Sequence, residues 1–198
     1  WSLVWPIVAG AGYRVILLDS RKHGRSGWNE VPLTYEQFAD DVAGLIEVLG
    51  IPRVDLVGWS DGAITALQFA MSYPDKLKRA VVYGANISPD GFVFPEESET
   101  LEQYIAGAAE SFAALSPAPE RFGDLYLELK ALYESAPNFS ETQLQAITAP
   151  VLVIDGANEE LIAPDQPVRI AESIPGAELV ILEGTGHFAP FELPSVFA

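Results

Sequence analysis

Short runs of apolar, β-branched residues alternate along this chain with segments of helical periodicity, and this alternation narrows the folds that the chain can adopt. Five runs predict strands, at 13–18, 54–57, 80–83, 151–154 and 179–182. Helical patterns lie at 34–49, 61–73 and 165–174. Strands that alternate with helices are typical of a parallel sheet covered by helices. We therefore expect an α/β fold built on a mostly parallel sheet.

The first of these helices carries its own boundary signals. Thr34 fits the N-cap position, and Gln37 three residues later completes the pattern of a capping box. Gly50 is expected to end the helix. Between these ends runs one apolar stripe, made of Phe38, Val42, Leu45, Ile46 and Leu49.

Residues 87–148 depart from this alternation. They are acidic, contain many alanines and aromatic residues, and show no strand pattern. Their helical patterns lie at 101–115, 120–133 and 141–147. We predict that 87–148 is a helical cap, inserted into a core domain that comprises residues 1–86 and 149–198.

Composition excludes several classes of function. The 28 acidic and 11 basic residues give a formal charge of -17, which argues against nucleic-acid and membrane partners and mildly favours cationic ligands. The chain has no cysteine, so disulfides, thiol nucleophiles and zinc–thiolate sites are excluded. No apolar run approaches the roughly 20 residues that span a bilayer, and no secretion signal is visible. We therefore expect a cytoplasmic protein.

The segment Gly58-Trp59-Ser60-Asp61-Gly62 has the form G-x-S-x-G and lies between a predicted strand and a predicted helix. A sharp strand-to-helix turn strains the serine backbone, and the flanking glycines remove side chains that would collide with neighbouring backbone. The turn lifts the hydroxyl to the carboxyl edge of the sheet, near the positive end of the helix. The segment therefore predicts that Ser60 is a nucleophile.

A serine hydroxyl is a weak nucleophile and needs a base. The chain has two histidines, His23 after the first predicted strand and His187 after the last. Where a serine lies on such a turn, the triad occurs in the order serine, acid, histidine, and this order favours His187.

The triad acid is expected after the strand that precedes the His187 segment, because it orients the imidazole. That strand leads into three carboxylates, Asp155, Glu159 and Glu160. Asp155 comes directly off the strand and is expected to point elsewhere, whereas Glu160 is expected to face water. We therefore favour Glu159, with Asp155 and Glu160 as the alternatives.

These segments together resemble the α/β-hydrolase family over nearly the whole chain. The matching positions are Asp19, Arg21, Gly24, Ser26, Gly58–Gly62, Gly156, Glu159, Gly186 and His187. In this family the acid commonly stands three residues after the glycine at the strand end, where Glu159 falls, although the family usually has aspartate there. Residues 58–67 and 83–86 are most similar to the valacyclovir-hydrolase-like (biphenyl hydrolase-like) serine esterases.

The resemblance implies hydrolysis of a small-molecule carboxylic ester through an acyl-enzyme, by Ser60, Glu159 and His187 and without metal or cofactor. It implies that the Asp61 N–H is one oxyanion donor and that the Asp61 and Trp59 side chains contact substrate. In that branch the acid after the nucleophile binds an amino group, which implies α-amino esters. Alternatively, Asp61 only stabilises the start of its helix.

Other activities would use the same triad, namely those of a lactonase, an amidase or peptidase, a C–C hydrolase or a perhydrolase. A non-catalytic ligand receptor or an inert remnant is the alternative of another class. The resemblance also implies strands before Trp1 and one strand between 13–18 and 54–57, together with a loop that donates the second oxyanion amide. We therefore expect a central gap in the sheet and a sequence that is part of a longer chain.

Overall fold

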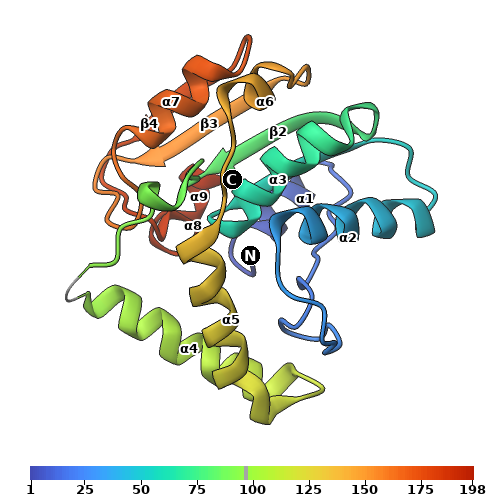
Figure 1. The fold of residues 1–198 in the computed structure, drawn as a ribbon, viewed down its shortest axis with the longest axis vertical. Coiled ribbons are helices and arrows are strands. Elements are labelled where there is room, and N and C mark those ends of the chain that lie inside the picture. Colours follow the sequence, from blue (N-terminus) through green and yellow to red (C-terminus); the bar gives the residue numbers. More distant parts are fainter. Residues whose placement is uncertain (96–97) are drawn as a thin grey trace.

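A four-stranded parallel sheet forms the centre of the computed structural model, which describes residues 1–95 and 98–198 (Figure 1). The strands, in spatial order, are β1 (Val54–Trp59), β2 (Leu77–Tyr83), β3 (Val151–Gly156) and β4 (Glu178–Leu182). Each neighbouring pair runs parallel, with Val57 beside Val81 and Val82 beside Val153. The predicted α/β fold with a parallel sheet is confirmed.

Helices lie on both faces of this sheet (Figure 1). Their bounds are α1 (Trp5–Gly10), α2 (Tyr35–Val48), α3 (Asp61–Ser72), α4 (Glu99–Leu115), α5 (Phe122–Ser135), α6 (Glu141–Gln145), α7 (Gln166–Ser173), α8 (Ala189–Glu192) and α9 (Pro194–Phe197). Because strand side chains alternate between faces, Val82 and Val153 enter the main core with α3 and α7. Val81 and Leu152 lie in the second cluster, with Phe197 of α9.

The predicted signals of α2 are met in part. The Thr34 hydroxyl oxygen accepts a hydrogen bond from the Gln37 N–H at 3.1 Å, which is one half of the expected capping box. Phe38 and Ile46 of the apolar stripe are buried. Leu49 is 41% exposed, contrary to expectation, because the helix ends at Val48 and the stripe no longer faces the core beyond it.

The strand predicted at 13–18 is wrong. The segment has no assigned secondary structure and no strand partner among the described residues, because a strand forms only where a neighbour pairs with its backbone. Leu17 is 53% exposed, and Val57 on the facing strand β1 is 49% exposed. A cavity of about 1440 Å³ is lined by both segments. This gap lies where the family resemblance placed a further strand.

Helices α4 and α5 project away from the sheet (Figure 1), and we call them the cap helices. Two ion pairs tie α5 and the turn before it to the core. The fully buried Lys22 side chain bonds Glu128 at 2.7 Å, and Arg121 bonds Glu30 at 3.0 Å. The division of the chain into core and cap domains remains a prediction.

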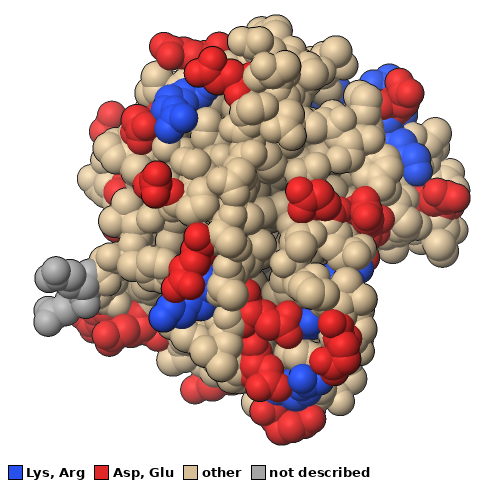
Figure 2. All heavy atoms as spheres, viewed as in Figure 1, with Lys and Arg blue, Asp and Glu red and all other residues tan. Residues whose placement is uncertain are grey.

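The surface carries more acidic than basic side chains, as the composition requires. Figure 2 shows acidic side chains spread over the viewed face, with fewer basic ones among them. None of the described helices is long and apolar enough to cross a membrane.

Candidate active site

Ser60 lies on the turn that joins β1 to α3. Its φ of 55° and ψ of -120° are strained values for a residue that carries a Cβ. The Ser60 N–H donates to the Tyr83 carbonyl at the end of β2, at 2.9 Å, and this bond fixes the turn at the carboxyl edge of the sheet. Ser60 and His187 both line the large cavity. This is the geometry of a nucleophile elbow.

The two glycines of the elbow differ in their roles. A Cβ on Gly58 would collide with the backbone of Gly62 and Ala63, so close helix–strand packing requires glycine at 58. A Cβ on Gly62 would meet nothing within 4 Å among the described residues outside its own helix turn and its chain neighbours. The expectation that both glycines avoid collisions therefore holds for Gly58 and is wrong for Gly62.

Replacing Gly58 with alanine is expected to lower the free energy of unfolding by about 1–3 kcal/mol, because the added methyl group must push α3 away from β1. Denaturant unfolding measures this loss. Gly62→Ala is the matched control and is expected to change stability by less than about 1 kcal/mol. Equal losses in the two variants would show that the close approach of α3 to β1 is not what requires glycine at 58.

The two histidines have different partners. His187 is only 2% exposed, and its Nδ1 lies 3.0 Å and 2.9 Å from the two carboxylate oxygens of Glu159. His23 instead donates from Nδ1 to the Arg21 carbonyl at 2.8 Å, and its ring lies in an edge-to-face arrangement with Phe38. His187 is thus the histidine that the structure joins to a carboxylate.

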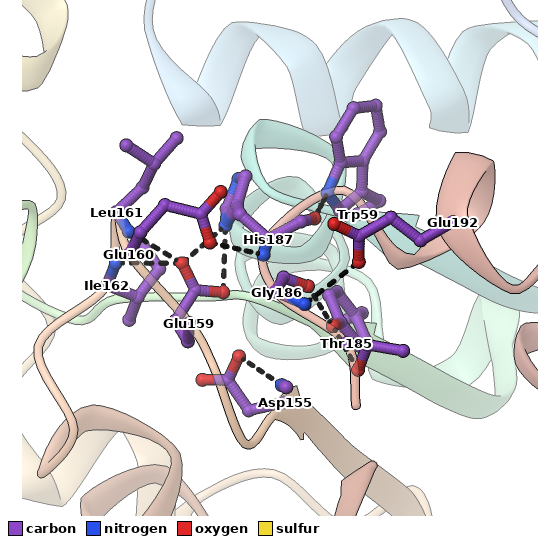
Figure 3. A network of polar contacts seen from close by, with 12 residues as sticks. Trp59, Asp155, Glu159, Glu160, Leu161, Ile162, Thr185, Gly186, His187 and Glu192 are labelled. Carbon is purple, nitrogen blue, oxygen red and sulfur yellow. Dashed lines mark hydrogen bonds and ion pairs between the residues drawn. The ribbon is translucent and has the colours of Figure 1, made fainter. Parts of the chain in front are cut away.

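Glu159 is held as an acceptor from several sides (Figure 3). Besides His187, its Oε1 accepts the N–H groups of Leu161 at 2.7 Å and Ile162 at 3.1 Å. Burial by itself would raise the pKa of Glu159, but the hydrogen bonds from His187, Asp155 and the Leu161 N–H hold this pKa below its ordinary value. Glu159 is therefore ionised at neutral pH and suited to orient an imidazole.

The other two carboxylates of the segment lie elsewhere (Figure 3). Asp155 is 2% exposed and accepts the Gly156 N–H at 2.9 Å. Burial, together with the nearby Glu159 carboxylate, raises the pKa of Asp155 to about 8, so it is mostly protonated at neutral pH. Glu160 does not simply face water, as expected from sequence, but accepts the His187 backbone N–H at 2.9 Å.

Sequence reasoning missed other residues that hold the loop carrying His187. The Tyr83 hydroxyl donates to the Gly186 carbonyl at 2.5 Å, and Glu192 accepts the Gly186 N–H at 2.9 Å. Gly84, at φ +62°, leaves room for the imidazole, because a Cβ there would lie 2.9 Å from His187 Cε1. The available signals were the position of Tyr83 at the end of a predicted strand and the family resemblance at 83–86 and Gly186.

Asp61 lies directly after Ser60 and bridges α2 and the cap helix α5. Its two carboxylate oxygens accept the hydroxyls of Tyr35 on α2 and Tyr133 on α5, each at 2.8 Å. Burial raises the pKa of both tyrosines, and the Asp61 charge raises them further, so both remain O–H donors. The Asp61 N–H is among the first in α3, where helix N–H groups lack partners within the helix.

An aromatic wall borders the cavity beside Ser60. The Trp59 ring centroid lies 5.6 Å from those of Tyr104 and Phe191 and 5.9 Å from that of Phe188. The Trp59 indole N–H donates to the His187 carbonyl at 2.7 Å. Among the described residues, no group of three histidine, aspartate or glutamate side chains is placed to hold a metal ion.

Comparison with known proteins places the chain in a family. The family model described as "Alpha/beta hydrolase family" matches residues 1–198. The chain belongs to the α/β-hydrolase family. This membership confirms the family expected from the elbow and the histidine segment, and it makes the chain a hydrolase of the α/β superfamily.

Its relatives differ in the reactions that their names describe. A 2-hydroxy-6-oxononadienedioate/2-hydroxy-6-oxononatrienedioate hydrolase of Burkholderia vietnamiensis is 30% identical, over 93% of this chain and 73% of the relative. A putative esterase/lipase of Haemophilus influenzae is 26% identical, over 92% and 70%. The solved meta-cleavage product hydrolase of Pseudomonas fluorescens shares the fold, with a TM-score of 0.79, 21% identity and coverage of 100% and 80%.

Proposed function

We propose that this α/β hydrolase cleaves small carboxylic esters through an acyl-enzyme on Ser60. The observation that carries the proposal is the bond from His187 Nδ1 to the ionised Glu159, which leaves Nε2 as the ring nitrogen available to a nucleophile. Ser60 supports it by lying on a strained elbow that lines the same cavity as His187.

In the first half-reaction, Ser60 Oγ attacks the ester carbonyl carbon while its proton passes to His187 Nε2. Glu159 stabilises the resulting imidazolium. The carbonyl oxygen gains the negative charge of the tetrahedral intermediate, and the Asp61 N–H at the start of α3 is one donor for it. His187 then returns the proton to the departing alkoxide. In the second half-reaction, water attacks the acyl-enzyme through the same base and restores the Ser60 hydroxyl.

We infer further that Asp61 favours substrates with an ammonium group close to the ester. Its carboxylate lines the cavity directly after Ser60. The two tyrosine donors occupy part of its acceptor capacity, since a carboxylate offers about four lone-pair sites. A partly buried carboxylate attracts a cation strongly because the local dielectric is low. The formal charge of -17 adds a weaker steering effect that salt screens.

Asp61→Asn is expected to reduce the preference for valyl esters over matched 3-methylbutanoyl esters at least tenfold, which corresponds to about 1.4 kcal/mol. The measurement is kcat/KM for both esters on both proteins. Tyr133→Phe is the matched control, because it removes one hydrogen bond to Asp61 and keeps the charge. It is expected to cost about 1 kcal/mol of stability and to retain the preference. An Asp61→Asn enzyme that loses stability but keeps its amine preference would mean that Asp61 only ties α2 to α5.

The second candidate is C–C bond hydrolysis, because relatives at 30% identity are named as hydrolases of 2-hydroxy-6-oxo acids, which have no ester bond to cleave. Their named substrates, a dioate and a dienoate, are carboxylates. The Asp61 charge beside Ser60 would repel an anionic group placed there, which favours neutral or cationic esters for this chain. Parallel assays with p-nitrophenyl acetate and a 2-hydroxy-6-oxo-dienoate distinguish the two. Faster turnover of the dienoate would replace the ester proposal with the second candidate.

A further inference from the structure

We propose that Glu160 and Trp59 are positioning residues that hold the main chain of His187 from both sides, so that its imidazole keeps its orientation in the cavity that Ser60 also lines. This inference rests on the proposed function, in which His187 is the base. It gives a role to two residues that are adjacent to triad residues in sequence: Glu160 follows Glu159, and Trp59 precedes Ser60.

Three of the four polar groups of His187 are bound. Glu160 accepts its N–H at 2.9 Å, the Trp59 indole donates to its carbonyl at 2.7 Å, and Glu159 bonds its Nδ1 (Figure 3). The fourth group is Nε2, the atom that must take the proton from Ser60. The backbone of this residue is thus fixed separately from its ring, and both constraints act on the position of one nitrogen.

The contact between Glu160 and His187 follows from the position of Glu160 directly after Glu159. Glu159 and Glu160 are consecutive, so a single turn after β3 delivers one carboxylate to the ring and the next to the backbone of the same histidine. The residue before the histidine is Gly186, and a Cβ there would collide with the Glu160 carboxylate. Glycine at position 186 therefore leaves room for the Glu160 carboxylate to reach the His187 N–H.

Trp59 connects the two halves of the catalytic arrangement. It ends β1 immediately before Ser60, while its indole N–H reaches the carbonyl of His187, 128 residues further along the chain. The ring of Trp59 also packs at 5.8 Å from the imidazole and at 5.9 Å from Phe188. The nucleophile turn and the histidine loop are thereby joined by a contact outside the triad.

This arrangement matters because a displacement of about 1 Å in a reacting group can cost about 100-fold in rate. His187 lies in a loop, and loops move more than the strands that they follow. Holding the N–H and the carbonyl of one residue removes the freedom of its peptide planes to rotate. Without these two bonds, Glu159 alone would restrain the ring, and the backbone of the loop would be held only through Gly186, by Tyr83 and Glu192.

The test compares Glu160→Ala, Glu160→Gln and Trp59→Phe by ester kinetics. Glu160→Ala is expected to lower kcat about 10- to 100-fold, with KM within about twofold. Trp59→Phe is expected to lower kcat by a similar factor. Glu160→Gln is expected to recover most of the rate, because its amide oxygen still accepts the His187 N–H. Glu183→Ala is the control, since Glu183 is an exposed glutamate close to the same loop.

Two further readouts separate positioning from a general loss of structure. In a His187→Ala background, Glu160→Ala is expected to cause no further loss of kcat, because its effect acts through His187. By proton NMR, Glu160→Ala is expected to speed solvent exchange of the His187 Nδ1 proton. The chain has only two histidines, so His23→Gln assigns this signal.

The positioning role of Glu160 and the proposed function of the chain are tested by different outcomes. Unchanged kcat and unchanged exchange in Glu160→Ala, or equal losses of kcat with and without His187, would overturn the positioning role. If the unmodified chain shows no turnover that depends on Ser60, the proposed function fails. The exchange measurement needs no turnover, so it still tests the link from Glu160 to His187. If Glu160→Ala does not fold, Glu160→Gln and Trp59→Phe carry the same comparison.

Discussion

Ser60→Ala is expected to lower kcat for neutral esters by at least about 10⁴-fold, because it removes the hydroxyl that forms the acyl-enzyme. Stability is expected to change by less than about 1 kcal/mol. The Ser60 side chain does not cap α3, and alanine retains the Cβ that the strained turn already accommodates. Turnover of p-nitrophenyl acetate against a buffer blank and urea unfolding measure the two effects.

A fluorophosphonate probe provides the control for this prediction, because it labels only an activated serine. Labelling of the unmodified chain that disappears in Ser60→Ala is expected. Substantial ester turnover by Ser60→Ala would show that the chemistry uses another nucleophile. An unmodified chain that is neither labelled nor active would favour the non-catalytic alternative.

The sheet and the elbow were predictable because their signals are local. An apolar run followed by Gly58 and Ser60 specifies a strand, a sharp turn and a helix within a few residues. The segment at 13–18 has an equally good strand pattern but no strand structure. A strand depends on a partner that supplies backbone hydrogen bonds, and propensity alone cannot indicate whether one lies alongside.

The site residues show the same difference between positions with a local sequence signal and positions that depend on a distant partner. Motifs and chain order point to Ser60, Glu159 and His187, and the structure brings Glu159 to His187. The partner of Glu160 lies 27 residues away, so its direction depends on how two loops meet. The tyrosine partners of Asp61 lie 26 and 72 residues away, on α2 and on α5, and no local pattern links them.

Glu159→Gln is expected to lower kcat by about 10³- to 10⁴-fold at neutral pH, although glutamine has nearly the same shape. A neutral amide cannot stabilise the imidazolium, and it can bind the imidazole in the wrong tautomer by donating to Nδ1. The low pKa of Glu159 means that the unmodified carboxylate supplies its charge throughout the neutral range. The measurement is kcat for a neutral ester, with KM expected to change little.

Asp155→Asn is the matched control, because Asp155 is the buried carboxyl next to Glu159 and is mostly neutral at pH 7. Its kcat is expected to stay within about tenfold of the unmodified enzyme.

The folded-state pKa of Asp155, about 8, lies above the ordinary value of 3.8, so the folded chain holds this proton more tightly than the unfolded chain. The free energy of unfolding therefore falls as pH rises from about 4 to about 8, and Asp155→Asn is expected to remove that fall. Urea unfolding at pH 5 and at about pH 8.5 measures it. A larger loss of kcat in Asp155→Asn than in Glu159→Gln would make Asp155 the acid that His187 requires.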